Sequence, residues 1–356
     1  MRNDNYLNYI DKLLPTLPDY IADYYHAKRS IPLSPVTLYH YLVIYQHFFE
    51  WLREAKIVTA TDNSMISLSD LENLKLKDMQ LYKENLINRK KLNSKRTDAG
   101  LLKSSVNPPI AALKSLFKYL SVESENDNGT AYIDRNVMLK VPAVKDGRTL
   151  QNRAQEIESK LLLDNEDIDF INFIANQYEH QISAHQQVYF KRFKTRDLAI
   201  VAMFLSSGVR LSELCNLDMN DIDLATPSIK VTRKGGNVDF VYLRTVFLDY
   251  ISDYIDQRAI MFPGIGDYPA CFVTYRQSEV ARIAPRTVEK MITRYSTAYG
   301  KPFSPHKLRH SLATKLYAKT HNEQLVRTQL GQTSAQSTRL YTHIVQQTQE
   351  DALKDL

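Results

Sequence analysis

The sequence contains little cysteine, glycine and proline, and it lacks any long apolar run. Its two cysteines, Cys215 and Cys271, stand far apart, which argues against a disulfide framework or a cysteine-based zinc site and fits a reducing cytosol. Ten glycines and 13 prolines exclude a low-complexity chain. The longest apolar run, residues 198–205, is far shorter than the roughly 20 residues that span a bilayer, and the N-terminus lacks the apolar core of a signal peptide. We therefore expect a cytoplasmic protein without a membrane segment.

What is present is the composition of a globular protein with a basic tilt. Of the 356 residues, 44% are hydrophobic and 24% are charged, and a chain of this length has room for two ordinary domains. The formal net charge is +6 and the pI is about 9.0. A basic balance permits a nucleic-acid partner, but many basic proteins never touch DNA, so charge alone does not decide the function.

The first half of the chain predicts helices only. Ser34 followed by Pro35 is a typical helix start, and an apolar stripe at helical spacing follows it: Leu38, Tyr41, Leu42, Tyr45, Phe48, Phe49 and Leu52. Asn107 followed by Pro108 predicts a second helix start, and shorter helical stretches cover residues 6–25 and 74–86. We expect residues 1–150 to form an all-α domain, with a linker in the polar, punctuated segment 141–155.

A basic segment interrupts these helices. It holds Arg89, Lys90, Lys91, Lys95 and Arg96, with Lys103 just beyond it. A charge run of this kind is most often a solvated loop. It becomes a candidate for contacts with DNA phosphates only if the second half of the chain carries DNA chemistry.

The second half predicts helices around a small sheet. Helical stretches are expected at residues 161–174 and 195–206, and again from Arg286 onward. We expect residues 156–356 to form one mainly α domain with a small antiparallel β-sheet.

The sheet is predicted from a hairpin pattern. Two β-type runs, residues 228–232 and 238–243, flank the Gly-rich turn Arg233-Lys234-Gly235-Gly236-Asn237. Short β-type runs around such a turn are typical of antiparallel strands. A third run, residues 271–275, is expected to complete the same sheet.

Four short motifs carry residues suited to chemistry on an anion. Arg210 follows one helix end and precedes the next helix, a place suited to anion binding. Lys234 lies in the hairpin turn, and His306 and Arg309 project from one helical face because they are three residues apart. Gln332 and Tyr341 complete the series. Taken singly each motif is weak, because such cations usually face water or pair with a carboxylate, and the chain has 22 tyrosines.

Taken together and in this order, the motifs resemble the tyrosine recombinase family, whose catalytic domain carries Arg, Lys, His-x-x-Arg, His or Trp, and Tyr. The matching stretches are SGVRLSEL, VTRKGGN, PHKLRHSLAT, LGQTS and STRLYTHI. In the first half, TLYHYLVIYQHFFEWL and PPIAALKSLFKYL look like core-binding helices of Xer-type recombinases. The resemblance therefore covers nearly the whole chain, and it is strongest to the Xer recombinases that work without a second partner enzyme.

The resemblance implies a fold and a set of catalytic roles. Residues 1–150 would be a SAM-like helical core-binding domain, and residues 156–356 a catalytic domain of the DNA breaking-rejoining type. Tyr341 would be the nucleophile that forms a 3′-phosphotyrosyl link. Arg210 and Arg309 would form a phosphate clamp. Lys234 would be the general acid, and His306 would accept or position the tyrosine proton.

These roles agree with elementary electrostatics. Attack on a phosphodiester adds negative charge to an anion, so catalysis needs cations aimed at the nonbridging oxygens. Arginine stays charged and its planar fork pairs with phosphate, so two arginines can serve without a metal ion. We expect no metal, no cofactor, no ATP and no small-molecule substrate. Glu213 is expected to orient Arg210, whereas His310 and His343 are expected to be structural.

Gln332 departs from the family pattern, which has His or Trp at this place. Glutamine can donate a hydrogen bond to a phosphate oxygen, but it cannot carry a positive charge. We expect an active enzyme whose cleavage step is slower or differs in its pH dependence.

The resemblance also implies partners. They are double-stranded DNA, a second copy in a homodimer on each site, and a homotetramer in the synapse, with the tail at residues 346–356 docked into a neighbouring protomer. For the Xer branch it implies resolution of chromosome dimers at a dif-like site during cell division, at the nucleoid and under an FtsK-like septal DNA translocase. Two alternatives stay open: a mobile-element integrase, and a non-catalytic DNA-binding protein of the same fold.

Overall fold

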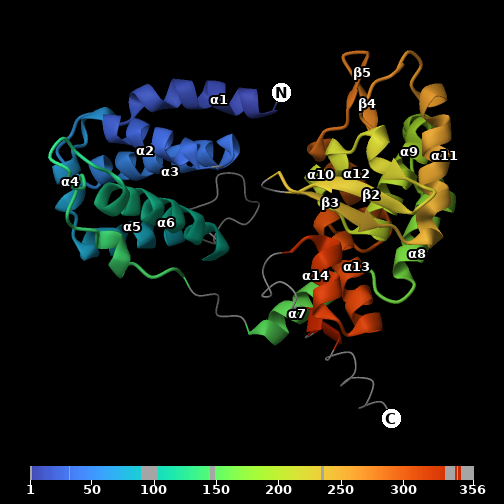
Figure 1. Cartoon of the computed structure of the whole chain (residues 1–356). Coiled ribbons are helices and arrows are strands. Elements are labelled where there is room, and N and C mark those ends of the chain that lie inside the picture. Colours follow the sequence, from blue (N-terminus) through green and yellow to red (C-terminus); the bar gives the residue numbers. More distant parts are fainter. Residues whose placement is uncertain are drawn as a thin grey trace, which may run out of the picture. The chain divides into compact units, whose positions relative to one another are not determined.

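The chain divides into two units between residues 147 and 148 (Figure 1). The computed structural model describes residues 2–31, 33–89, 103–144, 149–233, 236–332, 341–342 and 344–345. Unit 1 is Met1–Gly147 and unit 2 is Arg148–Leu356. The division lies inside the segment for which the sequence predicts a linker. Helix α7, Leu150–Glu158, begins within that segment.

The described residues of unit 1 form helices joined by loops, without a strand. The α-helices are α1 Arg2–Leu13, α2 Asp19–Ser30, α3 Pro35–Glu54, α4 Leu68–Glu72, α5 Leu76–Asn88 and α6 Lys103–Lys118. Short single turns lie at Leu14–Thr16, Asn63–Met65, Tyr119–Glu123 and Val137–Lys140. At the start of α3 the Ser34 hydroxyl accepts from the Thr37 amide at 3.3 Å, as the sequence predicts. Of the predicted α3 stripe, every residue but the half-buried Tyr41 is buried in the core of this unit.

The predicted start of α6 was wrong by about one turn. The helix begins at Lys103, so Pro108 and its neighbour Pro109 lie inside it. Asn107 does not cap the helix; its side-chain amide pairs with the backbone of Val144, with Asn107 Oδ1 2.8 Å from the Val144 nitrogen and Asn107 Nδ2 3.0 Å from the Val144 oxygen. Asn107 therefore holds the backbone at Val144, a role that local helix rules do not anticipate.

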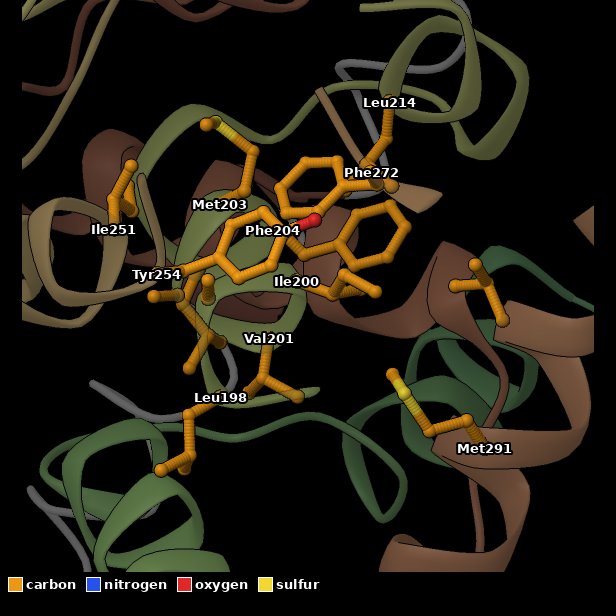
Figure 2. Close-up of a cluster of buried hydrophobic side chains, with 14 of the residues drawn as sticks. Leu198, Ile200, Val201, Met203, Phe204, Leu214, Ile251, Tyr254, Phe272 and Met291 are labelled. Carbon is orange, nitrogen blue, oxygen red and sulfur yellow. The ribbon is translucent and has the colours of Figure 1, made fainter. Parts of the chain in front are cut away.

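Unit 2 is built around α9, whose second half is buried on every side. Its α-helices are α7, α8 Glu166–Asn176, α9 Ala184–Ser207, α10 Leu211–Asn216, α11 Leu248–Met261, α12 Pro285–Ala298, α13 Pro305–Thr320 and α14 Glu323–Leu330, with single turns at Tyr178–Gln181, Met219–Asp221 and Thr245–Phe247. Residues 196–207 of α9 are all buried, which explains the apolar run of the sequence. Figure 2 shows Phe204 of α9 packed with Tyr254 of α11 and Phe272. Helix α8 begins later than its predicted stretch and α9 begins earlier, but both predicted helices are present.

The predicted hairpin is present, but the predicted third strand belongs to another sheet. Strands β2 Ser228–Thr232 and β3 Val238–Tyr242 pair antiparallel. Their sheet is completed by β1 Ile222–Asp223 beside β2. The run at 271–275 instead contributes to β4 Val273–Arg276, which pairs with β5 Glu279–Arg282 in a separate two-stranded sheet. The fold class is therefore the predicted one, mainly α with small antiparallel sheets.

The predicted apolar run is a core helix and not a membrane segment. Among the helices that the structure describes, none combines the length and the apolar character needed to cross a membrane.

Candidate active site

The corner between α9 and α10 is shaped by a glycine that no other residue could replace without strain. Gly208 ends α9 in the left-handed conformation with φ 68°. A Cβ at this position would lie 2.8 Å from a methyl carbon of Leu330 and 2.9 Å from one of Leu312. The backbone therefore passes closely under α13 and α14, and the next helix starts with Arg210 at its N-cap.

Glu213 holds Arg210 in place. One carboxylate oxygen accepts from the Arg210 amide at 2.8 Å and the other from its guanidinium at 2.6 Å. The same buried carboxylate accepts from the guanidinium of Arg233, at the base of the hairpin, at 3.0 Å. Burial alone would raise the pKa of Glu213, but the bonds from Arg210 and the charge of Arg233 lower it below its ordinary value. The predicted orienting role of Glu213 agrees with this geometry, and Glu213 is an anion shared by two cations.

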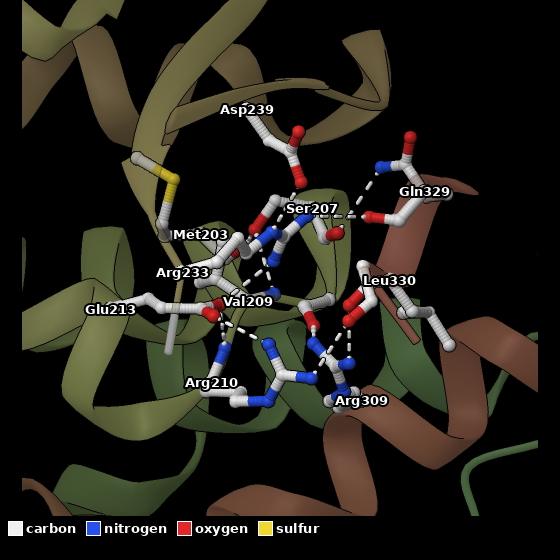
Figure 3. Close-up of polar contacts among 12 residues, drawn as sticks. Met203, Ser207, Val209, Arg210, Glu213, Arg233, Asp239, Arg309, Gln329 and Leu330 are labelled. Carbon is white, nitrogen blue, oxygen red and sulfur yellow. Dashed lines mark hydrogen bonds and ion pairs between the residues drawn. The ribbon is translucent and has the colours of Figure 1, made fainter. Parts of the chain in front are cut away.

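Arg210 and Arg309 converge on one turn (Figure 3). Arg309, on α13, is buried and donates to the carbonyl oxygens of Gly208 at 2.6 Å and Leu330 at 2.5 Å. Arg210 donates to the carbonyl oxygen of Gly331 at 2.9 Å. The two guanidiniums thus grip adjacent residues at the end of α14. Burial and the nearby charge of Arg210 lower the pKa of Arg309 to about 10.

The phenol of Tyr341 is buried in the same region. It packs in a cluster with Ala313, Val326 and Leu330. Its oxygen lies 2.9 Å from His310 Nδ1, and Gln332 Nε2 donates to it at 3.4 Å. Burial raises the pKa of Tyr341, against lowering effects of the Gln332 bond and the charge of Arg309. The phenol is therefore protonated in this structure, with two polar side chains on its oxygen.

The histidine that contacts the phenol is His310, whereas the sequence led us to expect His306 in that place. The two imidazole rings pack edge to face, with centroids 4.4 Å apart, and the His310 and Tyr341 rings are 5.5 Å apart. Burial and then the charge of His306 lower the pKa of His310 to about 3, so it is neutral near pH 7. Burial and the charge of Arg309 also lower the pKa of His306. His310, which we expect from the sequence to be structural, is thus the histidine in contact with the phenol oxygen.

Comparison with known proteins assigns the chain to a family. Residues 172–348 match the model of the phage integrase family. Over all 356 residues, and over the full length of both proteins, the chain is 41% identical to tyrosine recombinase XerS of Lactococcus lactis subsp. lactis (strain IL1403). It is 42% identical, with the same full coverage, to tyrosine recombinase XerS of Streptococcus agalactiae serotype III. The chain belongs to the tyrosine recombinases. It is an enzyme that cuts and rejoins DNA in site-specific recombination.

Solved structures give the same fold. XerH site-specific recombinase bound to a palindromic difH substrate superimposes with a TM-score of 0.60 at 20% identity, covering 90% of this chain and 78% of that chain. A lambda integrase dimer bound to a COC′ core site superimposes with a TM-score of 0.56 at 15% identity, covering 91% and 94% of the two chains. At these identities the likeness concerns the fold alone.

Several predicted site residues of the recombinase lie outside the described residues. These are Lys234 in the hairpin turn and four of the six basic candidates for DNA contact, Lys90, Lys91, Lys95 and Arg96; His343, expected to be structural, also lies outside them. Of the remaining two, Arg89 is exposed just after α5, and Lys103 is the first residue of α6.

Sequence reasoning missed two residues of the site, Arg233 and His310. Arg233 is buried and bonds to Glu213 and to Asp239, each at 3.0 Å. It stands directly before Lys234, so its burial anchors the strand end from which the Gly-rich turn leaves. The sequence gives only a weak sign of this role. Arg233 directly precedes Lys234 in the turn, and only Lys234 matches a residue of the family pattern. Within the described part of the chain, no group of three or more His, Cys, Asp and Glu side chains is placed to hold a metal ion.

Proposed function

We propose that this recombinase cuts each DNA strand with Tyr341, which becomes linked to the 3′ phosphate while a 5′-hydroxyl leaves. The observation that carries this proposal is the convergence of Arg210 and Arg309 on the turn at Leu330–Gly331, within electrostatic reach of the phenol. Two guanidiniums gathered there, with one shared carboxylate nearby, form a place with excess positive charge that suits a phosphate.

The proposed roles follow from the donors available. One terminal nitrogen of Arg210 and both of Arg309 now donate to backbone carbonyls, which are neutral acceptors, and a phosphate anion makes stronger bonds to the same donors. Gln332 donates a hydrogen bond to a phosphate oxygen, and Lys234 protonates the departing 5′ oxygen. Because the ester energy stays in the Tyr341–phosphate link, a 5′-hydroxyl of a second DNA can reverse the step without ATP.

We further propose that the DNA target is a dif-like chromosomal site and that the reaction resolves chromosome dimers during cell division. Full-length similarity to proteins named XerS supports this, as does a fold shared with a recombinase solved on difH. The 41% identity over the full length of both proteins favours it over a mobile-element integrase. Footprinting along the replication-terminus region of the host chromosome tests the target. Protection of a single inverted repeat there supports the proposal, and protection confined to a mobile element contradicts it.

Trapping of the covalent intermediate tests the chemistry. The footprinted duplex is given a nick beside the scissile phosphate, so that the released 5′-hydroxyl fragment diffuses away and the adduct accumulates. Wild type should form an adduct and Tyr341→Phe should form none. Tyr317→Phe, which removes another hydroxyl from α13 near the same cluster, should react like wild type. An adduct in Tyr341→Phe, or none in wild type, would overturn the assignment, and the second result would favour a DNA-binding protein without activity.

The assembly on DNA is proposed to be a homodimer on each site and a homotetramer in the synapse. An apolar groove of about 1320 Å³ on unit 2 supports it, lined among others by Leu312, Leu316, Leu325 and Val345. We propose that the tail at residues 346–356, which lies outside the described residues, enters this groove on a neighbouring copy. Truncation after Val345 should keep binding to one site and lose synapsis in a gel assay, and unchanged synapsis would contradict it. Regulation by an FtsK-like septal DNA translocase remains a part of the proposal that co-expression with and without that translocase would test.

A further inference from the structure

We propose that His310 is a further catalytic residue, whose Nδ1 holds the hydroxyl of Tyr341 and takes the phenol proton as the oxygen attacks phosphorus. This inference rests on the proposed function, since it assigns a proton acceptor to the proposed nucleophile. The second histidine of the HKLRH stretch, His310, thus takes the proton from the reacting phenol oxygen, and the ring of His306 lies beside that of His310.

The contact has the geometry and the protonation states that a proton acceptor requires. His310 Nδ1 lies 2.9 Å from the Tyr341 oxygen, within the range of a direct hydrogen bond. With its pKa lowered to about 3 by burial and by neighbouring cations, the imidazole is neutral, while burial keeps the phenol protonated. The hydroxyl therefore donates to Nδ1, and the imidazole proton sits on Nε2.

The other side chain on the phenol oxygen cannot take a proton. Gln332 Nε2 donates to that oxygen at 3.4 Å, and an amide nitrogen has no basic lone pair near neutral pH. The Gln332 Oε1 atom is buried and has no hydrogen-bond partner among the described residues. Gln332 can stabilise a developing phenolate, but the base among the two is His310.

The proposed step balances in protons and bonds. The bond from the Tyr341 oxygen to phosphorus forms and the bond from phosphorus to the 5′ oxygen breaks. The phenol proton moves to His310 Nδ1, and the departing 5′ oxygen takes a proton from Lys234. In the rejoining step both protons return.

The charges around His310 set when the proton moves. The charged and titratable groups that face it are His306, Lys307 and Arg309 from its own helix and the phenol of Tyr341. Lys307 and Arg309 oppose an imidazolium in the structure without DNA, which keeps the acceptor site free. The negative charge that builds on the phosphate between Arg210 and Arg309 offsets them, so the transfer coincides with attack.

The competing explanation is that His310 only fills space beside the phenol. Three variants separate the two explanations in single-turnover cleavage of the nicked duplex at saturating enzyme. His310→Asn places an amide oxygen near the position of Nδ1 and so keeps a hydrogen-bond acceptor that cannot be protonated. His310→Leu removes the acceptor. His321→Asn is the matched control, because His321 is exposed at the end of the same helix in a left-handed conformation that asparagine tolerates.

We expect cleavage about 100-fold slower in both His310 variants, the scale of general base catalysis, with DNA affinity close to wild type. The control should cleave at the wild-type rate. Cleavage by His310→Asn within about threefold of wild type would overturn the proposal, because a space-filling acceptor would then suffice.

Chemical rescue keeps the proposal testable even where a variant folds poorly. His310→Ala leaves room for added imidazole, which should restore cleavage in a saturable way and should not rescue Tyr341→Phe. An unfolded fraction would not respond to imidazole. The absence of rescue in a variant that still binds the duplex would count against proton transfer to this position.

A substrate with sulfur in place of the bridging 5′ oxygen separates the two ends of the reaction. A thiolate leaves without a proton, so Lys234→Ala should recover on this substrate while the His310 variants stay slow. Recovery of the His310 variants as well would place His310 on the leaving group and overturn the proposal. In either case, the adduct formed by wild type and lost in Tyr341→Phe keeps the proposed function separate from this inference.

Discussion

Two buried arginines of unit 2, Arg196 and Arg309, are treated in opposite ways by their surroundings. Arg196, on α9, donates to its neighbour Asp197 at 2.7 and 3.0 Å and to the carbonyl of Val273 at 3.2 Å. The same carboxylate accepts from the Tyr295 hydroxyl at 2.6 Å. Arg309 donates to carbonyls only, and no described carboxylate lies within ion-pair distance of it. One cation is neutralised where it stands and the other is not.

The pKa values state the same contrast. Burial would lower the pKa of Arg196, but the charge of Asp197 raises it above its ordinary value. For Arg309, burial and the charge of Arg210 act together and lower the pKa. Arg210 and Arg233 share the buried carboxylate of Glu213, Arg233 also pairs with Asp239, and Arg309 has no carboxylate partner among the described residues. Three guanidiniums therefore face two carboxylates, and this region keeps excess positive charge. A folded chain tolerates such an excess where an anionic ligand completes it, and that distinguishes the candidate site from an equally buried structural network.

The largest expected effect comes from changing the structural arginine, Arg196. Arg196→Met leaves the buried Asp197 carboxylate with the Tyr295 hydroxyl and one longer ion pair, to Arg294 at 3.7 Å, so we expect the free energy of unfolding to fall by about 3 kcal/mol. Urea titration measures it. Cleavage per folded molecule should be unchanged, and the added change Asp197→Leu should recover part of the loss. A stable Arg196→Met enzyme that cleaves slowly would show that the network serves catalysis and not stability.

The second test addresses Arg309 directly. Arg309→Lys keeps a charge but loses the fork that reaches two acceptors, so cleavage of the nicked duplex should slow by about 10²–10³-fold. The matched control is Arg258→Lys, because Arg258 is also buried and also donates to backbone carbonyls, those of Tyr268, Ala270 and Cys271. The control should lose stability and keep its cleavage rate. Equal losses of rate in both variants would assign Arg309 to the scaffold.

The sequence predicts most of the fold because its strongest patterns are local. Ser34 caps α3, and the turn Arg233–Asn237 separates two strands, since capping and turn chemistry act over a few residues. The apolar run at 198–205 is also a local pattern, and it lies in one buried helix. The order of Arg, Lys, His-x-x-Arg and Tyr adds family information that no single motif carries.

What the sequence does not predict depends on contacts between distant residues. Nothing local shows that Asn107 bonds to Val144, so its proline neighbour was taken for a helix start. The strand at 271–275 looks the same whether it pairs with β3 or with β5. His310 meets Tyr341 across 31 positions of sequence, and Arg233 meets Glu213 across 20. Partners of this kind follow from tertiary packing, which spacing along one helix or one turn cannot reveal.

The shared carboxylate gives a third and smaller effect. Glu213→Gln keeps the shape and removes the charge between Arg210 and Arg233, so we expect a loss of about 1.5–3 kcal/mol in the free energy of unfolding at pH 7 and slower cleavage. The pKa of Glu213 is lowered in the folded protein, so its contribution is present above about pH 4.5 and is lost as pH falls through the lower folded value. Wild type should therefore lose more stability than Glu213→Gln between pH 6 and about pH 3. Parallel pH profiles would show that the carboxylate contributes no charge-dependent stability.

The smallest effect tests whether the turn gripped by both arginines needs its glycine. Gly331 ends α14 with φ 57°, and a Cβ there would meet the guanidinium of Arg233. Gly331→Ala should lower the free energy of unfolding by about 1–2 kcal/mol through the left-handed backbone alone. Gly300→Ala is the matched control, because φ is 88° there and no heavy atom lies within 4 Å of the added carbon. Both variants carry the backbone cost, but only Gly331→Ala displaces Arg233 from Glu213, so only that variant should cleave more slowly; equal cleavage rates would mean that Arg233 does not support the site.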